Sequence, residues 1–109
     1  MVKTVKNTEW EKIVKKTMGE VKKHFPIIYV SIDFGAYIKP ENYFVSYIFR
    51  TNKELEEAKE SGLVLQIIQY HRERMMRNNY PVEAIKDCVF ASQEDCEELY
   101  NGNWFYYYK

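Results

Sequence analysis

Apolar residues recur at helical spacing in the first quarter of the chain. Thr8 and Glu11 form a capping box, which predicts that a helix begins there, and Pro26 predicts its end. Between these signals the apolar residues are three or four positions apart, so they share one face of the helix. They are Trp10, Ile13, Val14, Met18, Val21 and Phe25.

Two segments with alternating polarity follow. Ile27 to Phe34 and Tyr43 to Arg50 both favour β-strands, because successive strand residues point to opposite faces. The connection between them is short and holds Gly35 and Pro40, which favours an antiparallel hairpin. In the first strand we expect the core face to carry Ile28, Val30, Ile32 and Phe34.

A long helical segment begins after Thr51, which forms a second capping box with Glu54. As one straight helix it would be about 40 Å long, at about 1.5 Å per residue, which is long for so small a domain. Its apolar residues also change face near Gly62. We therefore expect a break at Ser61 and Gly62, with Leu63 to Arg77 as the main core helix.

The C-terminal part carries shorter elements. Val82 to Asp87 is interpreted as a turn into a short strand, Cys88 to Ala91. Ser92 is a candidate cap of a short acidic helix that ends at Asn101 and Gly102. The aromatic segment Asn103 to Lys109 is predicted to be a last strand, with Trp104, Tyr106 and Tyr108 on one side and Phe105 and Tyr107 on the other.

These elements predict one α+β domain over residues 1–109, in the order α-β-β-α-β-α-β. We expect a two-layer α/β sandwich with a mostly antiparallel sheet of about four strands. Two main helices would cover one face of the sheet. The other face would be partly open.

The chain has no net charge, but its two ends carry opposite net charges. The 16 basic and 16 acidic side chains cancel, so no global field favours nucleic acid. Residues 1–25 carry seven lysines against three glutamates, a net charge of +4, and residues 87–109 carry one lysine against five acidic residues, a net charge of −4. This gradient either steers a charged partner or pairs one end of the fold with the other.

The cysteines, the apolar segments and the missing motifs limit the compartments and cofactors that we expect. Cys88 and Cys96 lack the C-x-x-C spacing of a zinc or redox site, which favours a reduced, cytoplasmic protein. No apolar segment approaches the roughly 20 residues of a membrane span, and no secretion signal is predicted. Calcium-loop, phosphate-loop and nucleophile motifs are missing from the sequence, so we expect neither a metal nor another cofactor.

One group of residues contains the side-chain types of an enzyme active site. His71, Arg72, Arg74 and Arg77, together with Asp33, are the types that a metal-free phosphodiesterase uses as general base and anion clamps. However, a lone histidine on an apolar helix face is more often a hydrogen-bonded core residue, and no acid–base partner is evident. We therefore favour a non-catalytic protein, and the sequence leaves open whether His71, with Arg72, Arg74 and Arg77, is functional.

Aromatic residues supply the candidate binding surface. Ten tyrosines in 109 residues favour either a protein interface or a half-buried sheet covered by aromatic rings. Base stacking is a weaker interpretation, because it needs flanking cations and only Arg50 lies beside the predicted sheet. The predicted partner-binding residues are Tyr43, Tyr47, Glu94, Asp95, Glu97, Glu98, Trp104, Phe105, Tyr106, Tyr107 and Tyr108.

The leading functional hypothesis is a cytoplasmic protein-interaction module that binds another protein with a basic surface. In size and surface chemistry the chain resembles immunity and antitoxin proteins, which block the basic, often nucleic-acid-cleaving site of a toxin. No family motif accompanies this resemblance. The alternative is a small nucleic-acid-binding or nucleic-acid-processing domain that uses the lysines of the first helix with Arg72, Arg74 and Arg77, and self-association as a homodimer is a third possibility.

Overall fold

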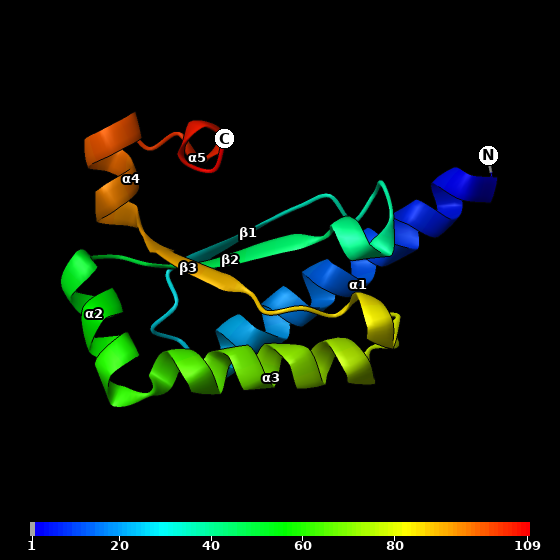
Figure 1. The fold of residues 1–109 in the computed structure, drawn as a ribbon, viewed down its shortest axis with the longest axis horizontal. Helices are drawn as coiled ribbons and strands as arrows, with labels where there is room; N and C mark the ends of the chain where they lie inside the picture. Colours follow the sequence, from blue (N-terminus) through cyan, green and yellow to red (C-terminus); the bar gives the residue numbers. More distant parts are fainter. Residues whose placement is uncertain (1) are drawn as a thin grey trace.

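The computed structural model describes the backbone of residues 2–109 and the side chains of residues 9–109 (Figure 1). Its helices and strands are interspersed along the chain, and two single turns of 3-10 helix, η1 and η2, lie in the connections. The elements are α1 (Val2–His24), β1 (Val30–Phe34), η1 (Pro40–Asn42), β2 (Phe44–Phe49), α2 (Asn52–Ser61), α3 (Leu63–Arg77), η2 (Val82–Ala84), β3 (Val89–Ser92), α4 (Gln93–Tyr100) and α5 (Trp104–Tyr107).

The sheet confirms the α+β class but not its predicted details. Within residues 2–109 it has three strands in the order β1-β2-β3, instead of about four. β1 and β2 pair antiparallel as predicted, whereas β2 and β3 pair in parallel. The parallel pair arises because α2 and α3 return the chain to the starting end of the sheet before β3 begins. The sheet is therefore mixed, and the prediction of a mostly antiparallel sheet is wrong.

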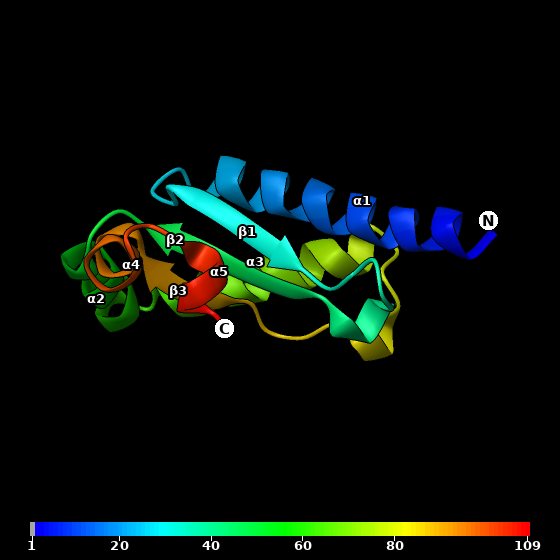
Figure 2. The same ribbon diagram turned by 90° about the horizontal axis from the view of Figure 1, so that it is seen from above.

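The sheet lies between two sets of helices (Figures 1 and 2). α1 and α3 lie side by side on one face, which we call the helix face, and α5 lies over the other, the second face. A two-layer description is therefore wrong, because α5 partly covers the face that was predicted to be open. The main core lies under the helix face and includes Val14, Met18, Val21, Tyr43, Val45, Tyr47, Phe49, Ile67 and Met75.

The orientation of β1 is the reverse of the prediction. Ser31 and Asp33 lie opposite Tyr47 and Val45, and residues paired in this way share a face of the sheet. Since Tyr47 and Val45 belong to the main core, Ser31 and Asp33 also face the helices, and Lys15 of α1 donates to Asp33 at 3.3 Å. Ile28 is buried in the core before the strand begins, whereas Val30, Ile32 and Phe34 line the second face.

Helix α1 is longer than predicted. It begins at Val2, so Thr8 and Glu11 lie inside the helix and do not start it. Its apolar stripe is confirmed, because Val14, Met18 and Val21 are buried against the sheet and α3. In the part of the chain with described backbone, no helix combines the length and apolar character needed to cross a membrane.

The break between α2 and α3 is confirmed. Gly62 has a φ angle of 86°, in the left-handed region that ends helices, and α3 starts at the next residue. Thr51 caps α2 by accepting a hydrogen bond from the Glu54 amide at 3.1 Å. Glu54 does not complete the capping box, because its carboxylate accepts from the amide of Arg50 at 3.2 Å. The turn sets α2 at an angle to α3 (Figure 1).

The predicted last strand is a helix. Residues Trp104–Tyr107 form α5, and the Asn103 side chain caps it by accepting from the Tyr106 amide. Five consecutive aromatic residues show no contrast between polar and apolar positions, so the apparent period of two carried no information about the secondary structure. A strand needs a neighbouring strand for its backbone hydrogen bonds, whereas a helical turn satisfies them internally, as from Tyr108 to Trp104 at 3.1 Å.

Candidate interaction surface

Two of the predicted partner-binding tyrosines are core residues. Tyr43, just before β2, and Tyr47, within it, are 1% and 0% exposed, because both point toward His71 of α3. Their ring atoms pack under the helix face, and their hydroxyls are hydrogen-bonded inside the protein. They cannot contact a partner in this structure, and their inclusion in the binding surface is corrected accordingly.

His71 joins these two tyrosines in a buried network. Tyr43 donates its hydroxyl proton to the carbonyl of Lys86 at 2.7 Å, so its oxygen can only accept from His71 Nε2, which lies 3.4 Å away. We therefore assign the Nε2–H tautomer, in which Nδ1 accepts from the Tyr47 hydroxyl at 3.0 Å. Burial, followed by the positive charge of Arg72, lowers the pKa of His71 to about 4. His71 is thus a neutral, satisfied core residue.

The groups considered for a phosphodiesterase are not assembled into a site. His71 is 0% exposed, so substrate cannot reach it. Arg72 forms an ion pair with Asp87 at 3.0 Å, and Arg74 holds both carboxylate oxygens of Glu20 at 3.0 and 3.1 Å. Arg72 and Arg74, which the nucleic-acid alternative also used, are therefore already engaged by carboxylates.

The acidic residues of α4 are distributed over two sides of the helix. Ser92 caps α4 by accepting from the Asp95 amide at 3.0 Å, as predicted. Glu94, Glu97 and Glu98 recur at spacings of three and four, so they share one side. Asp95 lies on the other side, where it accepts from the Tyr107 hydroxyl at 3.1 Å. Helix α4 thus separates an acidic face from α5.

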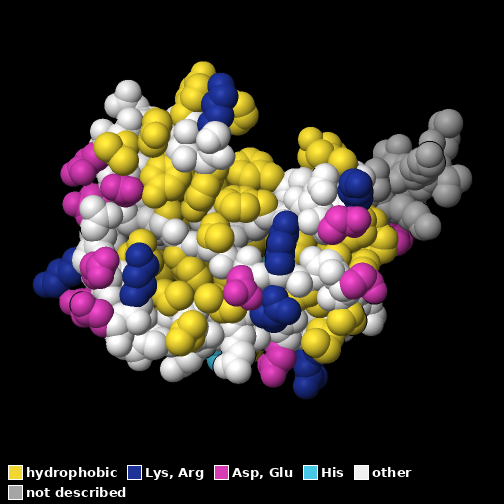
Figure 3. Space-filling model, viewed as in Figure 1, with side chains coloured by type: hydrophobic (Ala, Val, Ile, Leu, Met, Phe, Trp, Pro, Cys, Tyr) yellow, Lys and Arg dark blue, Asp and Glu magenta, His cyan; other side chains and the backbone are white. Residues whose placement is uncertain are grey.

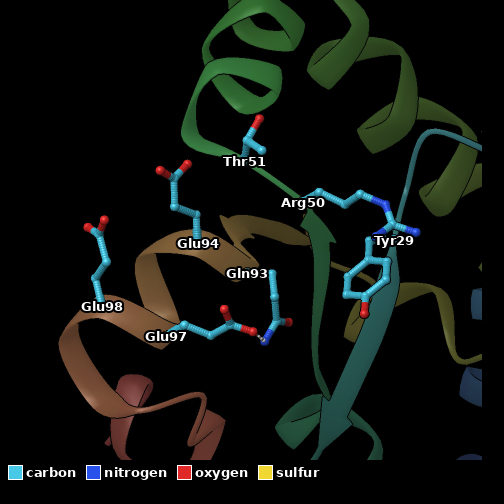
Figure 4. A pocket seen from close by; sticks show the side chains of 7 residues that line it. All are labelled: Tyr29, Arg50, Thr51, Gln93, Glu94, Glu97 and Glu98. Atoms are coloured by element: carbon cyan, nitrogen blue, oxygen red, sulfur yellow. Dashed lines mark hydrogen bonds between the residues drawn. The ribbon is translucent and has the colours of Figure 1, made fainter.

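An open hollow of about 490 Å³ lies beside the acidic face of α4 (Figure 4). Tyr29, just before β1, and Arg50, just after β2, form one wall, and the Arg50 guanidinium stacks 4.2 Å from the centre of the Tyr29 ring. The α4 wall is ordered by hydrogen bonds, in which Gln93 donates to Glu97 at 3.1 Å and the Asn52 amide donates to Glu94 at 2.8 Å. The seven lining residues are Tyr29, Arg50, Thr51, Gln93, Glu94, Glu97 and Glu98.

The aromatic residues of α5, with Tyr108 directly after it, divide into anchors and exposed rings. Tyr108 is anchored to the second face of the sheet, since its hydroxyl lies 2.6 Å from that of the buried Ser46, and Trp104 stacks on Tyr108. Burial, followed by the hydrogen bond with Asp95, raises the pKa of Tyr107 to about 12. Phe105 and Tyr106 are 64% and 52% exposed. Figure 3 shows hydrophobic side chains gathered around α5, with acidic side chains at the end where α2 and α4 lie.

The hollow contains residues that the sequence did not assign to a binding surface. Tyr29 and Gln93 were not predicted, and Arg50 was considered only as a cation beside the sheet. The predicted hairpin could have indicated the position of Tyr29. In the structure Val30 lies opposite Ile48, and the Tyr29 amide donates to the Ile48 carbonyl at 2.8 Å. That register brings Tyr29 to the end of β2. The approach of α4 depends on β3 and could not be read from the pattern.

The comparisons with known proteins leave the site to be interpreted from its own geometry. No family model matches the chain, and no curated protein or solved structure shows a significant match to it. Among the residues with described side chains, no three histidine, cysteine, aspartate or glutamate side chains gather closely enough to hold a metal ion. The described surface offers charge, aromatic rings and a hollow, which are features of recognition.

Proposed function

We propose that this protein is a non-catalytic, cytoplasmic interaction module, similar in role to immunity and antitoxin proteins, which binds and blocks a partner enzyme with a basic surface. The observation that carries the proposal is the acidic face of α4. Glu94, Glu97 and Glu98 share one side of this helix, and no described lysine or arginine forms an ion pair with them. Cys88 and Cys96 are free, buried thiols, which suits a reducing compartment.

The acidic face would act first on the encounter of the two proteins. Exposed carboxylates attract a basic surface over about one Debye length, near 8–10 Å at physiological salt, and they mainly raise the association rate. The exposed rings of Phe105 and Tyr106 lie on the other side of α4 and add contact area of the type that is enriched in binding hot spots. A partner that spans α4 contacts both sides. Tyr107, Tyr108 and Trp104 support that surface from below.

The test is titration against candidate basic nucleases, with affinity and association rate measured by biolayer interferometry. We expect the double variant Glu97→Gln with Glu98→Gln to weaken the complex at least about tenfold, chiefly by slowing association. The matched control is Glu56→Gln with Glu60→Gln, which removes two exposed carboxylates from α2. An equal loss in both double variants would show a response to net charge alone and would contradict the proposed surface.

A further inference from the structure

Arg50 is placed unusually for a cation near three carboxylates. It lines the same hollow as Glu94, Glu97 and Glu98, yet it forms no ion pair within the described residues. Its guanidinium instead stacks on the ring of Tyr29, 4.2 Å from the ring centre. The hollow therefore already displays the contact by which a guanidinium is held on an aromatic face.

The opposite wall of the hollow keeps carboxylates in place. The carboxylate of Glu97 accepts a hydrogen bond from the side-chain amide of Gln93. The carboxylate of Glu94 accepts one from the backbone amide of Asn52. Figure 4 shows Gln93 and Glu97 between the ring of Tyr29 and the outer glutamates. A cation that enters here meets an aromatic face and a positioned carboxylate, which together bind guanidinium better than either does alone.

We propose that this hollow receives an arginine side chain of the partner protein. The incoming guanidinium lies on the ring of Tyr29 in place of that of Arg50 and donates to the carboxylate of Glu97. The proposal rests on the proposed function, because it names the group by which the basic partner is recognised. The hollow, at about 490 Å³, is large enough for one such side chain without rearrangement of α4.

The test titrates the full chain with a small probe, Nα-acetyl-L-arginine N-methylamide. Binding is measured from the chemical shifts of the protein's backbone amides in NMR spectra. We expect saturable shifts at Tyr29, Arg50 and Gln93 with millimolar affinity. The citrulline analogue has nearly the same shape but no charge, and we expect no saturable shift from it. Absence of saturable shifts with the arginine probe, or equal shifts with both probes, overturns the proposal.

Variants separate the ring from the carboxylate. Tyr29→Phe keeps the ring and should leave probe affinity unchanged, whereas Tyr29→Leu should weaken it about two- to fivefold. Glu97→Gln should weaken it by a similar factor, and Glu56→Gln on α2 should have no effect. An undisturbed amide spectrum away from the hollow shows that each variant is folded. Unchanged affinity in both Tyr29→Leu and Glu97→Gln overturns the proposal.

The two proposals fail in different ways. If the arginine probe binds in the hollow but no basic protein binds the chain, the proposed function is wrong and the arginine site remains. If a basic protein binds through Glu97 and Glu98 but Tyr29→Leu leaves that complex unchanged, the proposed function stands. In that second outcome the partner does not use the hollow, and its arginine is not bound there.

Discussion

Tyr47 of β2 and His71 of α3 are joined by a hydrogen bond of 3.0 Å between the tyrosine hydroxyl and Nδ1 of the imidazole, with both residues fully buried. The pair connects the central strand to the main core helix. Burial raises the pKa of Tyr47 above its usual value and lowers that of His71, so both side chains are neutral at pH 7. The hydrogen bond therefore joins two uncharged groups in the core. It satisfies both the Tyr47 hydroxyl and Nδ1 of His71, which are buried away from water.

Removing one member of this pair should destabilise the fold. His71→Leu leaves the Tyr47 hydroxyl buried without a partner, and we expect the free energy of unfolding to fall by about 1–3 kcal/mol in urea denaturation. Tyr47→Phe should have a comparable effect through the unpaired Nδ1. In a double-mutant cycle the two changes should be coupled by at least about 0.5 kcal/mol. Strict additivity would contradict the shared hydrogen bond.

The same histidine should make stability depend on pH. Its pKa is lowered from 6.5 in the unfolded chain to about 4 in the fold, so the unfolded state binds the proton more readily. The stability that His71 contributes is therefore present above pH 6.5 and is lost as the pH falls through 4, by about 3 kcal/mol in all. Glu20, whose pKa is lowered chiefly by hydrogen bonding from Arg74, adds its own loss in acid.

The histidine contribution can be separated by comparison. Unfolding free energies measured between pH 7 and pH 4 should fall more steeply in the native protein than in His71→Leu. The loss from Glu20 is common to both proteins and cancels in their difference. Parallel pH profiles would show that His71 does not titrate differently in the folded and unfolded states.

The hydroxyl of Tyr108 should anchor α5 to the sheet. Tyr108→Phe removes the partner of Ser46, whose side chain is 0% exposed, so we expect a loss of about 1–3 kcal/mol in unfolding free energy. The control is Tyr106→Phe within α5, because the Tyr106 side chain is 52% exposed and its change should alter stability by less than about 0.5 kcal/mol. Similar effects in the two variants would mean that this hydroxyl pair does not hold α5.

The glycines should respond differently to alanine. At Gly35, with a φ of 85°, an added Cβ would overlap the carbonyl oxygen of Asn42, so Gly35→Ala should be the most destabilising of the series. Gly62 has a similar φ but open space around it, so Gly62→Ala should cost only about 1–2 kcal/mol of backbone strain. Gly19, inside α1 with open space, should gain about 0.5–1 kcal/mol. Thermal denaturation of the three variants would check this order.

Local signals in the sequence determined the elements that depend on neighbours along the chain. Thr51 and Ser92 cap their helices, and Gly62 separates α2 from α3, because a cap or a left-handed residue needs only a few adjacent backbone groups. The apolar stripe also placed His71 correctly in the core. The acidic face of α4 was contained in the spacing of Glu94, Glu97 and Glu98 once the helix was known.

Tertiary structure decided what depends on distant partners. The aromatic segment after Asn103 forms a helix, and its unbroken run of aromatic residues has no polar–apolar contrast from which this could be predicted. Its position comes from tertiary contacts, because Tyr107 donates to Asp95 and the Tyr108 hydroxyl pairs with that of Ser46. The face of β1 was decided by pairing with β2, because apolar residues on both sides of that strand left the choice to its neighbours. Tyr29, Arg50 and Glu97 share one hollow only because β1, β2 and α4 meet there. The sequence determined the local elements and their charges, whereas packing determined which of those charges face a common space.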